Sequence, residues 1–309
     1  MVDTEILTNS TYFFQNIVDG LSRGAVYAVF ALGFTLIFGV LDIVNLAHAA
    51  TYMWCAFIGW IVMAQMGLPL YIGLPVAMLA GGLIAVGLEF VAFRPLRKEG
   101  ADRLAPMISS IGASIIMVSV AEAIFTVQTK RFPSGVLDPK PLFIGGNNGV
   151  RISWAQLLII VVSILLMAGL GYLIRRTRTG KAIRAVAYSQ KTARLLGINV
   201  NRVVVITFFV GGVLAGAAGI LIGLLTNNIA PGMGSDVELR GLAVVILGGL
   251  GNIEGAVVGG FVLGLVETFT IAYLQKGSDY KDAVAFVILF LILLIRPNGL
   301  FGRKEVSRA

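Results

Sequence analysis

The 309-residue sequence has little of what a soluble catalytic domain is built from. It contains one cysteine, Cys55, and one histidine, His48. A single cysteine excludes an intramolecular disulfide or a multi-cysteine metal site, and a single histidine excludes a histidine-rich one. Only 13% of the residues are charged, against about 25% in soluble domains, so polar side chains cannot cover a water-soluble globule. A soluble enzyme, a disordered chain and a disulfide-stapled secreted domain are therefore excluded.

A nucleotide-binding loop is also missing. Gly180-Lys181 is followed by Ala182 instead of Ser or Thr, and no glycine stands five residues before Gly180. The chain therefore lacks the Gly-x4-Gly-Lys-Ser/Thr sequence that cradles nucleotide phosphates. No cofactor and no metal site are predicted for this chain.

The sequence is rich in long uncharged apolar stretches, and 57% of its residues are hydrophobic. A spanning helix needs about 20 mostly apolar residues. Eight stretches meet or approach this requirement, at 24–41, 43–66, 70–88, 104–121, 152–174, 203–225, 254–275 and 283–295. The shorter segment 239–251 is predicted to be a broken or re-entrant element inside the protein. We therefore expect an all-α polytopic membrane protein with one domain, 1–309, and eight or nine transmembrane helices.

Basic residues predict the orientation, because cytoplasmic loops are rich in Lys and Arg. Loop 94–103, loop 175–202 and the tail with Arg303, Lys304 and Arg308 are expected in the cytoplasm. Segment 128–151 is separated from each basic loop by one span and is expected outside, as an irregular external segment. An external N-terminus and a cytoplasmic C-terminus require an odd number of crossings, which makes 239–251 the ninth.

The net charge of +8 is concentrated in one place. Loop 175–202 has eight basic residues and no acid, and the rest of the chain has 16 of each sign. The excess is not a diffuse basic surface, so nucleic acid is not expected as a partner.

Two breaks interrupt the apolar helices. The first, 42–48, contains Asp42, Asn45 and His48, and the second, 248–254, contains Gly249, Gly251, Asn252 and Glu254. Paired interruptions are typical of the central pathway of repeat-built transporters. For His48 a packing role is slightly favoured over a substrate contact. For Glu254, receiving a polar substrate group and capping the next helix are equally favoured. Glu122 and Glu267 are expected near the membrane interfaces.

Loop 175–202 contains a predicted amphipathic helix. Thr179 is expected to cap its start, and Gly197 is expected to end it. Its apolar face is formed by Ile183, Val186, Ala187 and Ala193. This face favours docking into a groove on a partner protein, and a position on the bilayer surface is the alternative.

Glycines spaced by four predict tight helix contacts, because small residues let backbones approach. Pairs of this kind are Gly212 with Gly216, Gly219 with Gly223, and Gly260 with Gly264.

Over nearly its whole length the chain resembles the permease subunits of the high-affinity, Liv-type branched-chain amino acid ABC importers. The matching segments are Gly24-Ala25-Val26-Tyr27-Ala28, Asn45-Leu46-Ala47-His48, Phe93-Arg94-Pro95-Leu96-Arg97, Gly180-Lys181-Ala182-Ile183-Arg184-Ala185, Leu195-Leu196-Gly197-Ile198-Asn199, the run 247–256 and the run 296–303. One departure is Ala47-His48-Ala49-Ala50, where the family commonly has Ala-His-Gly-Glu.

The resemblance implies import of branched-chain or other neutral amino acids across a bacterial inner membrane. It implies a second related permease subunit, two cytoplasmic ATPase subunits that hold ATP and Mg, and an external solute-binding protein. It places the substrate pathway at Asp42, Asn45, His48, Gly249, Gly251, Asn252 and Glu254. It places ATPase coupling at Gly180, Lys181, Arg184, Ala187, Tyr188, Arg194 and Gly197.

Three alternatives stay open. The same importer class also includes permeases for urea or short amides. A stand-alone secondary transporter or channel would use Glu254 and His48 as a proton relay. A membrane scaffold without transport activity would use only the basic helix.

Overall fold

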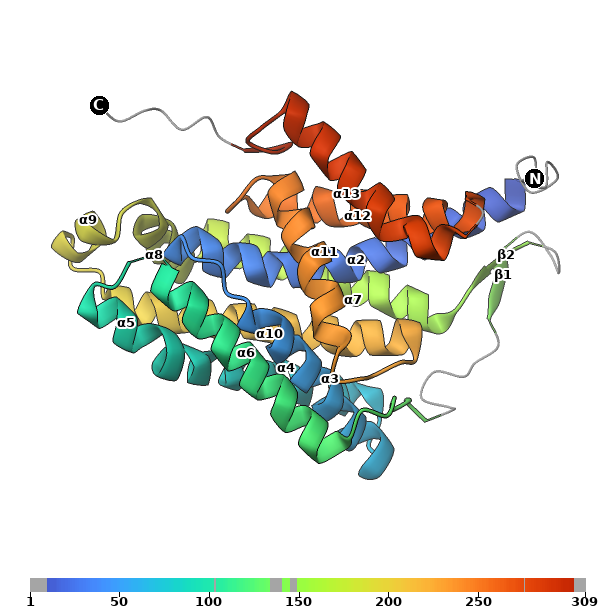
Figure 1. Cartoon of the computed structure of the whole chain (residues 1–309), viewed down its shortest axis with the longest axis horizontal. Helices are drawn as coiled ribbons and strands as arrows, with labels where there is room; N and C mark the ends of the chain where they lie inside the picture. Colours follow the sequence, from blue (N-terminus) through green and yellow to red (C-terminus); the bar gives the residue numbers. More distant parts are fainter. Residues whose placement is uncertain (1–9, 103, 134–140, 145–148, 275, 303–309) are drawn as a thin grey trace.

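A computed structural model describes residues 10–102, 104–133, 141–144, 149–274 and 276–302. The first nine residues, parts of segment 128–151 and the basic tail with Arg303, Lys304 and Arg308 lie outside the described residues. The described chain forms a helical bundle and one small hairpin (Figure 1). The predicted all-α membrane fold is confirmed, and the hairpin is an element that the sequence did not predict.

The elements follow one another with short connections except between α6 and β1, which residues 126–141 connect. The first half contains α2 (Ser10–Leu41), α3 (Ala47–Trp60), η1 (Ile61–Gln65), α4 (Leu70–Leu88), η2 (Glu89–Phe93), α5 (Arg94–Glu99) and α6 (Leu104–Phe125). The hairpin strands are β1 (Leu142–Ile144) and β2 (Val150–Ile152), paired antiparallel with Phe143 opposite Arg151. The second half contains α7 (Trp154–Arg176), α8 (Arg178–Tyr188), α9 (Gln190–Leu195), α10 (Val200–Thr226), α11 (Met233–Gly248), α12 (Ile253–Tyr273) and α13 (Gly277–Ile295).

Seven described helical stretches are long and apolar enough to cross a membrane. They coincide with seven of the eight predicted spans. The eighth, 283–295, lies within α13, whose helix begins at Gly277 and so includes Asp279, Lys281 and Asp282. Residues 239–248 of segment 239–251 belong to α11, and 249–251 form the turn after it. Helix α11 starts earlier than predicted, at Met233, and lies across the direction of the other helices (Figure 1).

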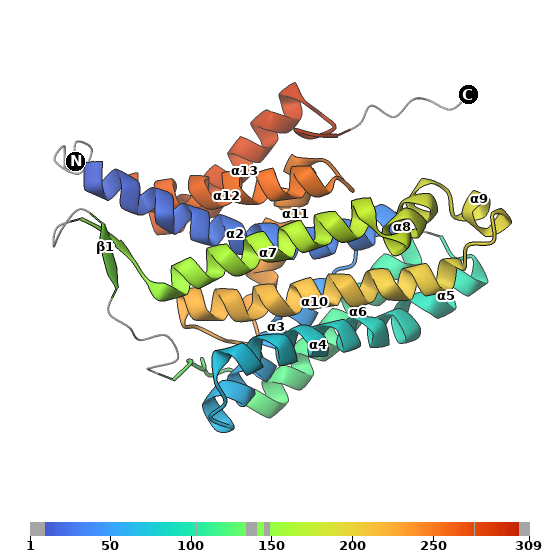
Figure 2. The same cartoon turned by 180° about the vertical axis from the view of Figure 1, so that it is seen from behind.

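The bundle has two chemically different ends. Helices α5, α8 and α9 gather at one end, which we call the basic end, and the start of α2 and the β1–β2 hairpin lie at the other, the hairpin end (Figures 1 and 2). Arg97 of α5 donates a hydrogen bond to Asn201 of α10 at 3.2 Å. The predicted loops 94–103 and 175–202 therefore share one end, and the described part of 128–151 lies at the other.

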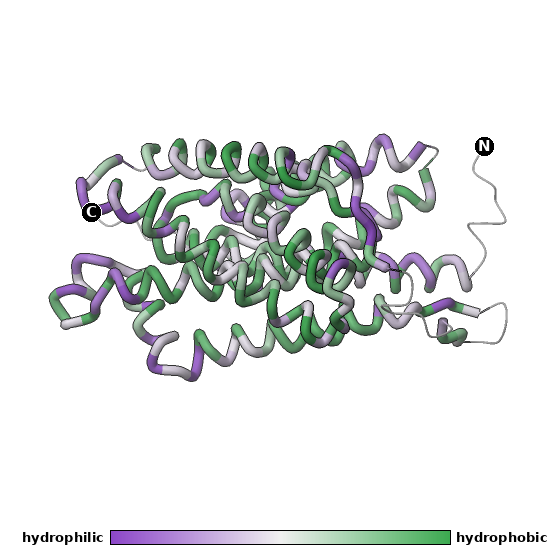
Figure 3. The backbone as a smooth tube through the Cα atoms, turned by 90° about the horizontal axis from the view of Figure 1, so that it is seen from below, coloured by the Kyte–Doolittle hydropathy of each residue, from purple (hydrophilic) through white to green (hydrophobic). Residues whose placement is uncertain are grey.

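Helix α2 is the centre of the bundle. Its residues 24–36 are buried without interruption, and α12, α10, α11 and α7 pack around it. By contrast, α6 and α7 expose apolar side chains such as Ile116 and Leu165 along their length. Hydrophobic residues cover the middle of the molecule and hydrophilic residues gather mostly toward its ends (Figure 3). This pattern is that of helices packed around a core and surrounded by lipid.

Glycine brings the inner helices into backbone contact, as the spacing by four predicted. A Cβ added at Gly264 of α12 would collide with the backbone of Gly24 in α2, and one at Gly212 of α10 would collide with Gly81 in α4. Only a residue without a side chain permits this approach.

Candidate functional site

The first break connects α2 to α3 and buries most of its polar residues. Asp42 has a positive φ of 56° and is exposed at the end of α2. Asn45 is buried, and its side-chain oxygen accepts a hydrogen bond from the Ala47 amide at 3.1 Å. The His48 ring lies 4.9 Å from the ring of Phe30 and 6.0 Å from that of Phe34. Asn45 thus helps to start α3, and His48 packs against α2.

The second break is a glycine turn at the basic end. Gly249 and Gly251 have φ values of 102° and 78°, which L side chains rarely adopt. Asn252 caps α12 by accepting a hydrogen bond from the Gly255 amide at 3.0 Å. The cap is therefore Asn252 and not Glu254, whose exposed carboxylate forms an ion pair with Arg175 of α7.

The two breaks approach each other at this end. A Cβ at Gly39, near the end of α2, would lie 3.6 Å from the Cα of Gly251.

The last described residues close over the glycine turn. The amide of Leu300 donates to the carbonyl of Leu247 at 2.8 Å, and that of Phe301 donates to Gly248 at 3.1 Å. Asn252 donates from Nδ2 to the carbonyl of Phe301 at 2.8 Å. We call residues 298–302 and their contacts with 247–252 the C-terminal clasp. It satisfies carbonyls that would otherwise be unpaired at the end of α11.

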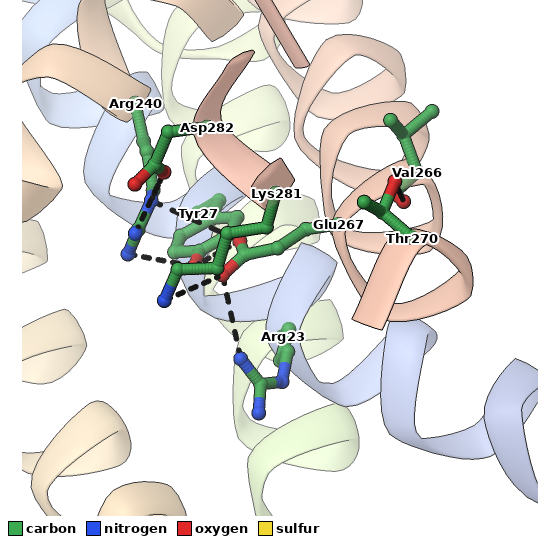
Figure 4. Close-up of polar contacts among 8 residues, drawn as sticks. All are labelled: Arg23, Tyr27, Arg240, Val266, Glu267, Thr270, Lys281 and Asp282. Carbon is green, nitrogen blue, oxygen red and sulfur yellow. Dashed lines mark hydrogen bonds and ion pairs between the residues drawn. The ribbon is translucent and has the colours of Figure 1, made fainter. Parts of the chain in front are cut away.

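A cluster of charges surrounds one buried carboxylate where α2, α11, α12 and α13 meet (Figure 4). Glu267 of α12 is only 2% exposed, so it is buried within the protein, and its expected position near a membrane interface stays a prediction. Its Oε2 accepts a hydrogen bond from the Tyr27 hydroxyl at 2.6 Å. Three cations surround this carboxylate, with Arg23 at 3.4 Å and Arg240 and Lys281 each at 3.9 Å. A buried carboxylate needs such partners to stay charged.

One more acid completes this group. Asp282 of α13 accepts hydrogen bonds from Arg240 Nε at 3.1 Å and Nη2 at 2.9 Å. We call Arg23, Tyr27, Arg240, Glu267, Lys281 and Asp282 the Glu267 cluster. Its ion pairs connect α13 to α11 through Arg240 and to α12 through Glu267.

The members of the Glu267 cluster other than Asp282 line a cavity of about 500 Å3. Other walls are Tyr52 of α3, Ile222 of α10, and Asp236 and Val237 of α11. A second cavity, of about 320 Å3, lies next to it toward the hairpin end and is lined by Tyr12, Asn16, Asp19, Arg23, Gln156 and Thr268, among others. Arg23 lines both cavities, so they follow one another along a single face of α2.

This face was accessible to sequence reasoning. Tyr12, Asn16, Asp19, Arg23 and Tyr27 recur every three or four residues, which places them on one side of a helix. The predicted first span began at residue 24, however, and so excluded most of this polar stripe. A helix starting at Ser10 reveals it.

Aromatic rings pack next to Tyr52, a residue that lines the larger cavity. The ring of Phe30 lies 5.5 Å from that of Tyr52, a cavity residue, and 4.9 Å from His48, one turn earlier on α3. His48 and the cavity residue Tyr52 therefore pack against the same ring, that of Phe30. Neither Asn45 nor His48, both sequence-predicted pathway residues, lines this cavity.

The predicted coupling loop contains two helices instead of one. Thr177, not Thr179, caps α8 by accepting from the Gly180 amide at 3.0 Å. Ser189 ends α8 and caps α9 by accepting from the Thr192 amide at 3.2 Å. Gly197 has the left-handed φ of 80° that the sequence predicted for a helix end.

Most of the predicted apolar face of these helices is buried against the bundle, and Ala187 is exposed on the surface of the protein. Ile183, Val186 and Ala193 are buried against the bundle, and a Cβ at Gly180 would collide with the carbonyls of Leu173 and Ile174. The predicted docking face is therefore largely used within the protein. A different apolar surface is exposed, formed by Tyr188 (72% exposed), Leu195 (82%) and Leu196 (73%), with Ala187 also exposed. Lys181, Arg184 and Arg194 are exposed beside it.

Comparison with known proteins places this architecture among transport permeases. A family model described as "Branched-chain amino acid transport system / permease component" matches residues 16–293. The chain is 39% identical to the high-affinity branched-chain amino acid transport system permease protein BraD of Pseudomonas aeruginosa, covering 96% of this chain and 98% of that one. It is 34% identical to LivH of Escherichia coli, a permease protein of the same description, with the same coverage. The ribose import permease protein RbsC of Haemophilus influenzae is 25% identical, covering 94% of this chain and 87% of that one.

Proposed function

This chain belongs to the family of branched-chain amino acid transport system permease components, and from that premise we propose that it carries branched-chain or other neutral amino acids into the cytoplasm. It is a multi-pass membrane permease with several spanning helices. In our proposal it works in a bacterial inner membrane with a second related permease subunit, two ATPase subunits and an external solute-binding protein. ATP and Mg would be bound by those ATPase subunits and not by this chain.

The charge distribution supports one orientation. The basic end carries the eight cations of loop 175–202 and the basic residues of loop 94–103, and such loops remain in the cytoplasm. The hairpin end then faces the outside, where a solute-binding protein would dock. The C-terminal clasp lies with the glycine turn at the basic end, which supports a cytoplasmic C-terminus in this proposal.

The observation that carries the proposal is the exposed surface of α8 and α9. Tyr188, Leu195 and Leu196 are large apolar or aromatic side chains on the water-facing end of a membrane protein, where they favour a protein partner. Behind them, α8 packs on α7, α10 and α2. A displacement imposed on this surface by an ATPase would therefore reach α2, the helix that lines both cavities.

The alternatives receive less support. Glu254 is exposed in an ion pair with Arg175, and His48 is enclosed by phenylalanine rings, an arrangement that does not favour a proton relay between them. A scaffold without transport activity has no use for two polar cavities along a central helix. Import of urea or a short amide differs from our proposal only in the substrate, which uptake measurements distinguish.

The coupling role is tested with Arg184→Glu combined with Arg194→Glu in the complete importer reconstituted in vesicles. We expect leucine uptake to fall by roughly tenfold or more, because charge reversal next to an interface costs several kcal/mol. ATP hydrolysis should no longer respond to the loaded binding protein, although the subunits still fold. Arg131→Glu, an exposed site at the hairpin end, is the matched control for charge reversal.

Three results would contradict the proposal in different ways. Unimpaired leucine uptake in the double variant removes the docking role of α8 and α9. Uptake that survives ATP depletion but collapses with an uncoupler indicates a secondary transporter. Uptake of urea or acetamide without leucine identifies an amide permease.

A further inference from the structure

The Glu267 cluster has more positive than negative charge. Within the cluster, Arg23, Arg240 and Lys281 stand against Glu267 and Asp282, which leaves one cation in excess. Asp236 is a further acid of the same cavity, but it forms none of the ion pairs that hold these three cations. The three cations converge on one carboxylate within 3.9 Å, so they also repel one another. In a partly buried site this repulsion is screened less than in water. An additional anionic group would relieve it.

Two of these cations have hydrogen-bonding capacity that Glu267 does not use. The ammonium of Lys281 lies 3.9 Å from Glu267 Oε1, beyond hydrogen-bond distance, so this contact leaves its three N–H donors available. Arg23 reaches the same oxygen through Nη1 alone, at 3.4 Å. A guanidinium has five N–H donors and binds a carboxylate best through two of them. Both side chains line the cavity and are partly exposed.

Arg240 and Tyr27 are engaged differently. Arg240 donates twice to Asp282, and the Tyr27 hydroxyl donates to Glu267 at 2.6 Å. These two residues hold the carboxylates in place. The positions open to a ligand are therefore on the side of Arg23 and Lys281.

The rest of the cavity suits an apolar side chain and a second charge. Ile222, Met233 and Val237 contribute apolar surface. Asp236, one helical turn before Arg240 on α11, contributes an exposed carboxylate. Cations, an acid and apolar walls around about 500 Å3 match the three parts of a zwitterionic amino acid.

We infer that this cavity is a substrate site of the permease, in which Arg23 and Lys281 receive the carboxylate of the amino acid and the apolar wall receives its side chain. The inference rests on the proposed function and extends it to a chemical requirement, since the substrate must be a carboxylate. The smaller cavity toward the hairpin end, which shares Arg23, is the approach from outside. A neutral amide supplies no negative charge and would leave the cationic excess unrelieved.

The test uses the complete importer in vesicles, with a saturating amount of binding protein loaded with radiolabelled L-leucine. Lys281→Gln and Arg23→Gln each remove one cation while keeping a polar side chain, and Lys281→Arg keeps the charge. Arg131→Gln, an exposed cation at the hairpin end, is the matched control. Leucine flux and ATP hydrolysis are measured together, so that the number of leucine molecules moved per ATP is obtained. Recovery of the assembled complex and its thermal midpoint report folding.

We expect Lys281→Gln and Arg23→Gln to lower leucine moved per ATP by roughly tenfold or more, the effect of losing a hydrogen bond to a charged group. The response of ATP hydrolysis to the loaded binding protein should persist, because that contact lies elsewhere. Lys281→Arg should recover most of the leucine moved per ATP. Because Arg131 lies at the end where the binding protein would dock, Arg131→Gln is compared by the same ratio, which should match the wild type.

Wild-type leucine flux per ATP in both glutamine variants overturns the inference and leaves the proposed function intact. If Lys281→Gln lowers recovery of the assembled complex, the number of leucine molecules moved per ATP by Arg23→Gln alone decides whether the inference stands. If the Arg131→Gln control also moves fewer leucine molecules per ATP, the effect is a general one of net charge, and the inference is overturned as well. A wild-type importer that moves acetamide and no leucine would instead contradict the proposed function itself.

Discussion

At the scale of single residues, the inner packing depends on positions without side chains. Gly81 of α4 and Gly212 of α10 place their backbones against each other, and a Cβ at Gly81 would collide with the Gly212 carbonyl and lie 2.9 Å from Cys55 Sγ. Gly87, also in α4, has no atom within 4 Å of an added Cβ. The same helix therefore contains one glycine required by packing and one that is not.

Gly81→Ala should lower the free energy of unfolding by about 1–3 kcal/mol, because overpacking forces the two helices apart. Gly87→Ala is the control, and it should raise stability by about 0.5–1 kcal/mol, since alanine is the better helix former. Thermal unfolding of both variants in lipid nanodiscs measures the difference. Equal effects at the two positions would show that the α4–α10 contact is looser than described.

Sequence reasoning at this scale succeeded where residue size decides a contact and failed where a distant partner decides it. Glycines spaced by four correctly predicted close helix contacts. The burial of Glu267 among cations from three other helices was not predicted. Those partners are distant in sequence, and no local pattern could connect them.

At the scale of elements, the helices and their approximate spans were predictable because hydrophobic length decides them. Helix ends were harder. Thr177 rather than Thr179 caps α8, since its position at the end of α7 lets its side chain reach the Gly180 amide. Ser189 divides what the periodicity suggested was one helix. Hydrogen bonds of one or two side chains determine where these helices end. The amphipathic pattern of the sequence does not predict those hydrogen bonds.

Asn252 has two roles, because its side-chain oxygen caps α12 and its Nδ2 donates a hydrogen bond to the C-terminal clasp. Asn252→Asp keeps the oxygen that caps α12 but removes the Nδ2 donor to the Phe301 carbonyl. Hydrogen exchange of the backbone amides in 298–302 should therefore accelerate at nearly unchanged stability. Asn252→Ala should accelerate it similarly and also cost about 1 kcal/mol for the lost cap. Asn199→Asp, at the cap of α10, is the matched control.

Unchanged exchange in Asn252→Asp would show that the amide bonds of Leu300 and Phe301 hold the clasp without the side chain.

At the scale of the whole molecule, the orientation is open to a direct test because the native cysteine is buried. Tyr188 lies at the basic end and Leu142 at the hairpin end, and both side chains are exposed. An impermeant maleimide should label Leu142→Cys in intact cells and Tyr188→Cys only after the cytoplasmic face is opened. The wild type, with only Cys55, gives the background. Labelling of both variants from the same side would contradict the proposed orientation.

The family resemblance, the membrane class and the two ends of the bundle could be predicted from the sequence. The distinction between core and lipid-facing helices could not. Helices α2 and α7 are both strongly apolar, yet α2 is enclosed and α7 is largely exposed. Lipid and protein interior are equally apolar surroundings, so hydropathy alone does not separate them.

The enclosure of α2 also has a consequence for biosynthesis. Among the described spans, α2 is translated first and has α12 as its most extensive partner, and α12 is translated after the other spans that pack on α2. Until Ile253–Tyr273 has been translated and inserted, Arg23 and Tyr27 lack Glu267 and face lipid or the insertion machinery instead. The core of this permease thus forms only after α12 has been inserted. A chain that stops before α12 keeps the charge of Arg23 in the membrane without its partner Glu267. Cellular quality control removes chains with defects of this kind.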